Sequence, residues 1–187
     1  GASASSEIAI TGLTPAPALT YRADAAGNFA NGITVWTGWG ADTIAVNGSH
    51  QRGTGANNDL RTVTTLNTGL GNDVVTLDLD AEDGFFALNT QGPENAYVGL
   101  LFDRDTVDAS ASSRPLVIFG GQDDDVIRGG TGGDIIFADR GTVTYHDGTT
   151  VAAVYGNGGP GDRTDGVERP LGIVTTAFPN LGGNDTV

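Results

Sequence analysis

The feature that most constrains this chain is a glycine-rich turn that ends in aspartate and is followed each time by a short apolar segment. It occurs as "GGQDDDVI" (120–127) and "GGTGGDII" (129–136), and in weaker form as "TGWGADTI" (37–44), "TGLGNDVV" (68–75) and "LGGNDTV" (181–187). Glycine allows backbone conformations that other residues avoid, and aspartate is favoured in turns because its short side chain reaches nearby backbone. A chain built from such units changes direction every few residues, which excludes long helices.

The turn units also belong to larger repeats. "ITVWTGWGADTIAV" (33–46) and "TTLNTGLGNDVVTL" (64–77) superpose at an offset of 31 residues, with Thr, Gly and Asp in matching places. Later intervals are irregular: 52 residues separate Asp73 from Asp125, and 51 separate Asp134 from Asp185. Self-similarity of this kind indicates stacked structural repeats. The irregular intervals indicate that some repeats are long or carry insertions.

The apolar segments are three to six residues long and rich in Val, Ile and Thr, which is typical of strands. We therefore expect an all-β fold, a right-handed parallel β-solenoid over residues 31–187, preceded by an N-terminal cap or linker over 1–30. "TVTYHDGTTVAAVY" (142–155) has two β-rich arms around Asp147 and Gly148, which predicts one inserted hairpin. Residues 156–170 are predicted to form a loop.

Composition limits the function. Nine arginines and no lysine stand against twenty-three acidic residues, for a net charge of −14. Such acidity argues against nucleic acid as a partner, because phosphate binding needs basic residues. No apolar run approaches the roughly 20 residues that span a bilayer, so we expect no membrane insertion. The sequence holds no Met and breaks off just after a turn signal, so we expect it to be a segment of a longer protein.

One nonapeptide carries a resemblance. "GGTGGDIIF" (129–137) fits the pattern G-G-x-G-x-D-x-U-x, with U apolar, at every position, and "GGQDDDVIR" (120–128) departs from it only at Asp123. The chain thus resembles the calcium-binding RTX, or haemolysin-type, repeat proteins. The resemblance implies a β-roll or β-helix whose six-residue turns bind Ca²⁺. It also implies a place in a large secreted or cell-surface protein, with neighbouring repeats of that protein as partners.

The residue chemistry points the same way. Ca²⁺ takes six to eight oxygen ligands at about 2.3–2.6 Å, from carboxylates and backbone carbonyls. Stacked carboxylates repel one another unless a cation lies between them, so we expect folding to be coupled to several calcium ions. The predicted calcium ligands are Asp42, Asp73, Gly121, Asp123, Asp125, Gly130, Gly132, Asp134, Asp139 and Asp185.

The neighbours of these ligands can also be predicted. In the roll that the resemblance implies, turns nine residues apart lie on opposite sides, so Asp125 and Asp134 need separate partners, and Asp139 is a candidate for one. Asp73 has no matching turn nine or eighteen residues away. Asp42 or Asp105 is its candidate neighbour.

The predicted function is a calcium-binding structural module of an adhesin or surface-layer type, and not an enzyme. Two alternatives stay open. Polysaccharide lyases and epimerases use acid, base and calcium on β-helices, and Arg104 in "FDRDTVD" (102–108) could act as base or bind a uronate, unless it belongs to an exposed charge-paired strand. A glycan-binding module is the other alternative, with Trp36 and Trp39 as a stacking platform and cell-surface glycan as partner.

Overall fold

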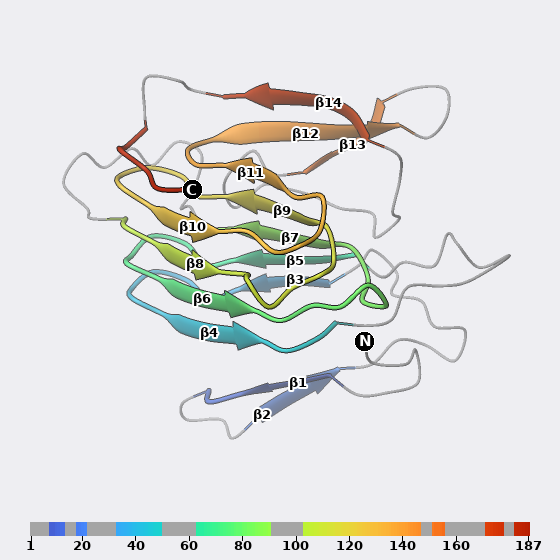
Figure 1. Cartoon of the computed structure of the whole chain (residues 1–187). Coiled ribbons are helices and arrows are strands. Elements are labelled where there is room, and N and C mark those ends of the chain that lie inside the picture. The colour runs from blue at the N-terminus through green and yellow to red at the C-terminus, as the bar shows by residue number, and fades with distance from the viewer. Residues whose placement is uncertain are drawn as a thin grey trace, which may run out of the picture.

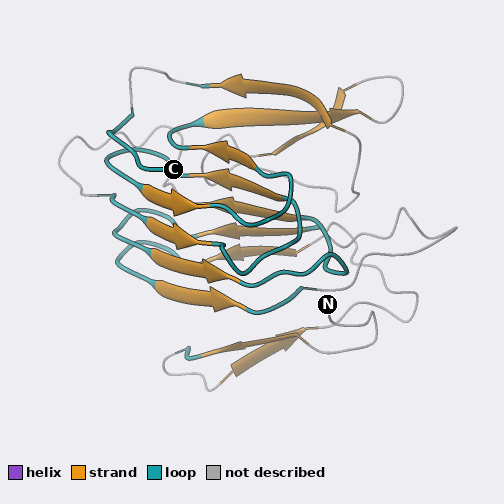
Figure 2. Ribbon diagram, viewed as in Figure 1, coloured by secondary structure: helices purple, strands orange, loops and turns teal. Residues whose placement is uncertain are grey.

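The computed structural model describes residues 8–13, 18–21, 33–49, 63–90, 103–146, 151–155, 171–177 and 182–187. Regular structure in these residues consists of strands alone (Figure 2). Two parallel sheets contain most of them. The five-stranded sheet consists of β3 (Ile33–Trp36), β5 (Thr64–Asn67), β7 (Phe86–Asn89), β9 (Leu116–Phe119) and β11 (Ile135–Phe137), in that spatial order. The four-stranded sheet consists of β4 (Thr43–Val46), β6 (Val74–Leu77), β8 (Thr106–Asp108) and β10 (Val126–Arg128).

The chain alternates between the two sheets, which lie face to face (Figure 1). Each glycine-rich turn ends where a strand begins, so strand pairing sets the turns one above another. Thr43 at the start of β4 pairs with Val74, Val74 with Thr106, and Thr106 with Val126. The residue before each of these four positions is an aspartate, and this register places the four aspartates in one line.

Two small antiparallel sheets complete the described structure. β1 (Ile8–Thr11) pairs with β2 (Ala18–Tyr21). β12 (Gly141–His146) lies between β13 (Val151–Tyr155) and β14 (Leu171–Thr176) in a three-stranded sheet. After β14 the chain returns to the four-stranded sheet, where Thr186 forms a parallel bridge with Val126.

The apolar core lies between the two parallel sheets. Leu77 and Val107 from the four-stranded sheet pack in one buried cluster with Leu88 and Ile118 from the five-stranded sheet. Strands β5, β7 and β9 are buried at every position, whereas β6 alternates between exposed and buried residues. The five-stranded sheet is therefore covered on both faces along these strands, and the four-stranded sheet keeps one face open to solvent.

A second apolar cluster covers the outer face of the five-stranded sheet. Phe119 and Phe137 stack there with ring centroids 4.9 Å apart and planes 6° from parallel. Val143 of β12 belongs to the same cluster, so the three-stranded sheet is attached to the stack by apolar packing. Offset aromatic stacking of this kind adds to the area it buries.

The expectation of strands without helices holds for the described residues, but the predicted right-handed parallel β-solenoid is wrong. The strands form two flat stacked parallel sheets and two separate antiparallel sheets. Repeated turn motifs indicate where a chain reverses, but they do not determine how the intervening segments join the strands. The antiparallel pair predicted over 142–155 is present as β12 and β13, and β14 adds a third strand on the other edge of β12. The turn at 147–148, the loop at 156–170 and most of the cap at 1–30 lie outside the described residues.

Candidate cation-binding site

Five aspartates lie in one line on the side where the chain passes from the five-stranded to the four-stranded sheet. We call them the aspartate column: Asp42, Asp73, Asp105, Asp125 and Asp185. Asp185 joins the line through the bridge between Thr186 and Val126. Asp73 thus lies between Asp42 and Asp105, the two neighbours that the sequence suggested for it.

A continuous chain of hydrogen bonds connects the aspartate column. The backbone N–H of Asp42 donates to Oδ1 of Asp73, and the N–H of Asp73 donates to Oδ1 of Asp105, both at 2.8 Å. The pattern continues from Asp105 to Asp125 and from Asp125 to Asp185, again at 2.8 Å. One oxygen of each accepting carboxylate is therefore fixed by the backbone of its neighbour.

The second carboxylate oxygens have no such partner. Oδ2 of Asp73, Asp105 and Asp125 is buried without a hydrogen-bond donor among the described residues, and each of these residues is only 1% exposed. Oδ2 of Asp42 is in the same state. Because burying a charged oxygen without a partner is costly, these atoms need either a proton or a cation.

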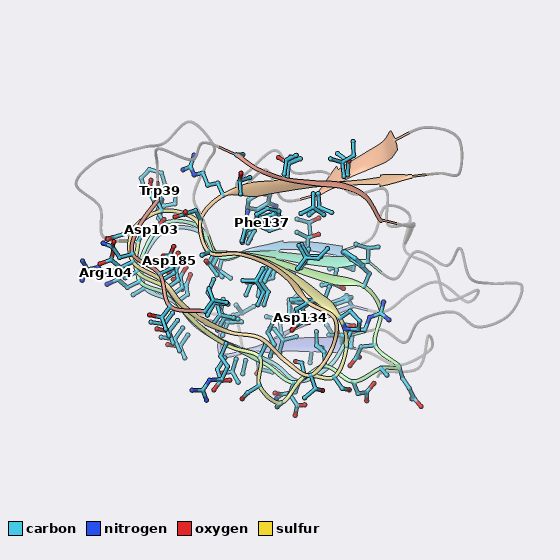
Figure 3. The ribbon with its side chains drawn as sticks, turned by 45° about the horizontal axis from the view of Figure 1, so that its top comes forward. Trp39, Asp103, Arg104, Asp134, Phe137 and Asp185 are labelled. Atoms are coloured by element: carbon cyan, nitrogen blue, oxygen red, sulfur yellow. The ribbon has the colours of Figure 1, made fainter. Side chains whose placement is uncertain are left out.

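Asp103 adds a further buried carboxylate beside the column. It stands two residues before Asp105, at the position that holds Gly40, Gly71 and Gly183 in three of the other turns and Asp123 in the fourth. Its Oδ1 accepts the N–H of Gly71 at 2.8 Å, while its Oδ2 is buried without a partner. In Figure 3, Asp103 and Asp185 lie on the same side of the molecule, close to Arg104.

Burial changes the acidity of these groups. It raises the pKa of Asp103 to about 7, of Asp105 to about 9 and of Asp125 to about 8, against the effect of the backbone N–H groups that donate to them. Repulsion from neighbouring carboxylates adds to each rise. The pKa values of Asp73 and Asp185 are also raised, mainly by burial. These carboxylates therefore resist ionisation when no cation is near: Asp73, Asp103, Asp105, Asp125 and Asp185.

The glycine-rich turns that contain Asp42 and Asp73 are in direct backbone contact with each other. Gly69 and Gly71 have φ of +95° and +143°, and a Cβ on either would overlap the carbonyl oxygen of Gly38 or Gly40 in the turn beneath. Only glycine fits both the conformation and the space. A carbonyl oxygen of one turn therefore lies directly against the glycine backbone of the next turn.

Three predicted ligands lie on the opposite side. Asp134 is placed across the molecule from Asp103 and Asp185 (Figure 3), as the nine-residue spacing from Asp125 predicts. Its Oδ1 accepts the N–H of Leu116 at 2.9 Å and its Oδ2 accepts that of Gly130 at 2.8 Å. Both oxygens therefore have donors. Gly132 is close to the backbone of Arg114 and supplies room for that packing.

Three other predicted ligands lie near the C-terminal end of the column. Oδ1 of Asp139 accepts the N–H of Gly183 at 2.9 Å, and Gly121 donates its N–H to the carbonyl of Asp139 at 3.1 Å. Asp123 has φ of +71° and forms an ion pair with Arg104 at 3.3 Å. Burial opposes ionisation of Asp123, but the N–H of Asp124 and the Arg104 guanidinium outweigh it and lower the pKa.

Two members of the site are absent from the predicted ligands. Asp105 was suggested only as a neighbour of Asp73, although it follows Asp73 by 32 residues, almost the 31-residue offset of the repeat. Asp103 belongs to "FDRDTVD", which was considered only as a catalytic segment. One feature of the sequence could have identified Asp103: it aligns with Gly40 and Gly71, each of which also stands two residues before a column aspartate. Unlike Asp123, which follows Gly120 and Gly121, Asp103 has no glycine pair before it, so its segment did not match the motif.

No protein-family model, curated protein or solved structure matches this chain. In the part of the chain that the structure describes, no group of three or more His, Cys, Asp or Glu side chains is arranged as a metal cluster, and no helix is long and apolar enough to cross a membrane. A cation in the column would accordingly be held by few carboxylates together with backbone carbonyls. Ca²⁺ accepts that mixture of oxygen donors.

Proposed function

We propose that the aspartate column binds Ca²⁺ and that binding stabilises the stacked sheets. The observation that carries this proposal is the row of buried Oδ2 atoms of Asp73, Asp105 and Asp125, none of which has a donor among the described residues. Ionised carboxylates in this arrangement repel one another, and a divalent cation removes both the repulsion and the missing contact. Calcium is favoured over transition metals because every available donor is oxygen.

The residues of the site have distinct roles in this proposal. Asp73, Asp105 and Asp125 would supply Oδ2 to the ions, and Asp103 would supply a further carboxylate oxygen. The N–H groups that donate to Oδ1 hold each carboxylate in place before an ion arrives. Calcium itself supplies positive charge and replaces protons on these groups, so its binding free energy is added to the stability of the fold.

The role that follows is structural. We propose a calcium-stabilised module of a secreted or cell-surface protein, of adhesin or surface-layer type, with neighbouring repeats of that protein as partners. Support comes from the resemblance of the turns to RTX repeats and from the position of the column along the strands that build the core. Arg104 forms ion pairs with Asp123 and Asp124 at 3.3 Å, which favours a charge-paired surface role over that of a lyase base.

Isothermal titration of the metal-free chain with calcium chloride tests the proposal. We expect heats that fit binding, and an affinity at least about tenfold weaker (about 1.4 kcal/mol) in the Asp105→Asn variant. Asp78→Asn is the matched control, because Asp78 is exposed and lies outside the column. Absence of binding, or equal affinities for the two variants, would contradict the proposal.

A further inference from the structure

The segment 182–187 is attached to the rest of the molecule mainly by backbone hydrogen bonds. Ile127 donates its N–H to the carbonyl of Thr186 at 2.8 Å, and Thr186 donates to the carbonyl of Asp125 at 2.9 Å. Neither buried apolar cluster includes a residue of this segment, and Val187 is 71% exposed. Apolar burial, which holds the other strands together, therefore contributes little to its attachment.

Carboxylates accept the segment's remaining hydrogen bonds. Gly183 donates its N–H to Asp139 at 2.9 Å, and Asn184 donates to Asp124 at 2.8 Å. Asp185 accepts from the N–H of Asp125 at 2.8 Å. Asp185 is 60 residues from Asp125 in the sequence. Docking of the segment therefore places the Asp185 carboxylate close to those of Asp124, Asp125 and Asp139.

This gathering of charge opposes docking. Arg104 lies beside Asp124 and offsets part of the charge, at 3.3 Å. Asp125 is 1% exposed, and its Oδ2 is buried without a donor. The unpartnered Oδ2 of Asp125 is the atom that a bound cation would contact.

We infer that a divalent cation held by Asp125 and Asp185 together with backbone carbonyls latches residues 182–187 onto β10, and that this end of the column loses its cation, so that the segment detaches, at a calcium concentration that still keeps β5 to β9 paired. The inference rests on the proposed calcium binding, but it assigns a separate, weaker equilibrium to one end of the column. Detachment exposes the edge of β10, where unpaired N–H and C=O groups can accept a strand from another chain or repeat.

Hydrogen–deuterium exchange of the full chain, followed as calcium is added to the metal-free protein, tests the latch. We expect amides of 182–187 and of Ile127 to become protected at higher calcium than those of β7 and β9. Asp185→Asn should shift the calcium midpoint of the segment by about tenfold or more and leave the midpoint of β7 and β9 within about twofold. Asn keeps the Oδ1 acceptor for Asp125, so this shift reports the lost charge, and Asp78→Asn should shift neither midpoint.

Other outcomes separate the two proposals. If β7 and β9 respond to calcium but the segment is equally protected with and without it, the latch is wrong and calcium binding stands. The latch is also wrong if Asp185→Asn moves both regions equally or neither. If no region responds to calcium, both proposals fail.

Discussion

Asp105 has one oxygen that accepts the N–H of Asp73 and another, buried, that has no donor among the described residues. Replacing it with Asn keeps the first contact and removes the charge. In the metal-free chain at pH 8, we expect Asp105→Asn to raise the urea midpoint of unfolding, because Asp105, with a pKa of about 9 in the folded chain, must take up a proton on folding at this pH and Asn need not. In saturating calcium the same variant should have a lower midpoint than wild type, because a ligand is lost.

The reversal of sign is the informative part of this experiment. A variant that merely disturbs packing lowers the midpoint under both conditions. Asp78→Asn serves as the control, and its exposed side chain should change the free energy of unfolding by no more than about 0.5 kcal/mol in either condition. An Asp105→Asn midpoint that moves in the same direction with and without calcium would rule out the account of the column.

The glycine turns make a different prediction, one that does not involve metal. Gly69 has φ of +95°, and a Cβ there would overlap the carbonyl oxygen of Gly38. Gly69→Ala should therefore cost about 1–3 kcal/mol from the backbone conformation alone, and more from the clash, with or without calcium. Gly133→Ala is the control, since a Cβ there meets nothing within 4 Å. Equal urea midpoints for the two variants would show that the turns are not in contact.

At the scale of the strand, the core depends on few side chains, because each strand contributes only three or four residues. Ile118 of β9 is fully buried between the sheets, whereas Ile44 of β4 is only partly buried at the end of the stack. Ile118→Ala should lower the free energy of unfolding by about 2–5 kcal/mol. Ile44→Ala should cost clearly less, because its site is partly open to solvent. Chemical denaturation of both variants in calcium shows which one loses more free energy of unfolding. A loss for Ile44→Ala as large as that for Ile118→Ala would contradict the core between the two sheets.

Most strands could be predicted from the sequence, because an apolar pattern bounded by glycine and aspartate is a local signal. "ITVW" and "TIAV" are β3 and β4 as expected. The burial of both faces of β5 could not be predicted, since "TTLN" contains two threonines and its cover comes from elsewhere in the molecule. How the strands assemble is likewise non-local, which is why the solenoid prediction failed.

The quality of the motif match does not follow the hydrogen bonding of the predicted ligands. "GGTGGDIIF" is the best match, yet both oxygens of its Asp134 accept backbone N–H groups. "TGLGNDVV" is a weaker match, yet Asp73 has a buried oxygen without a donor. Whether a carboxylate is available depends on the backbone that lies beside it in the next turn. The local sequence does not contain that information.

Considered as a whole, the molecule carries a net charge of −14 and gathers several carboxylates in a buried line. Asp103, Asp105 and Asp125 have pKa values of about 7, 9 and 8 in the folded chain, above the value of about 3.9 for an unfolded aspartate. At pH values between the pKa of an unfolded aspartate and these raised pKa values, the folded state binds more protons than the unfolded state. The free energy of unfolding therefore falls as pH rises, by up to about 1.4 kcal/mol per pH unit for each such group.

This linkage gives a prediction for the metal-free chain. Its urea midpoint should be higher at pH 5 than at pH 8, and saturating calcium should remove most of the difference, because cations then take the place of protons. Denaturation series at both pH values, on protein freed of metal by a chelating resin, check this. A metal-free midpoint that rises from pH 5 to pH 8 would show that the buried carboxylates do not behave as described.

The most direct test of the central claim is the thermal unfolding of the chain at pH 8, with millimolar calcium and with chelator, and with magnesium as the control for divalent charge. Each ion at a hundred times its dissociation constant adds about 2.7 kcal/mol, or about 5–10 °C in Tm for a chain of this size. The account predicts a rise of at least that amount in calcium and a much smaller one in magnesium. The same Tm in calcium and in chelator would contradict it.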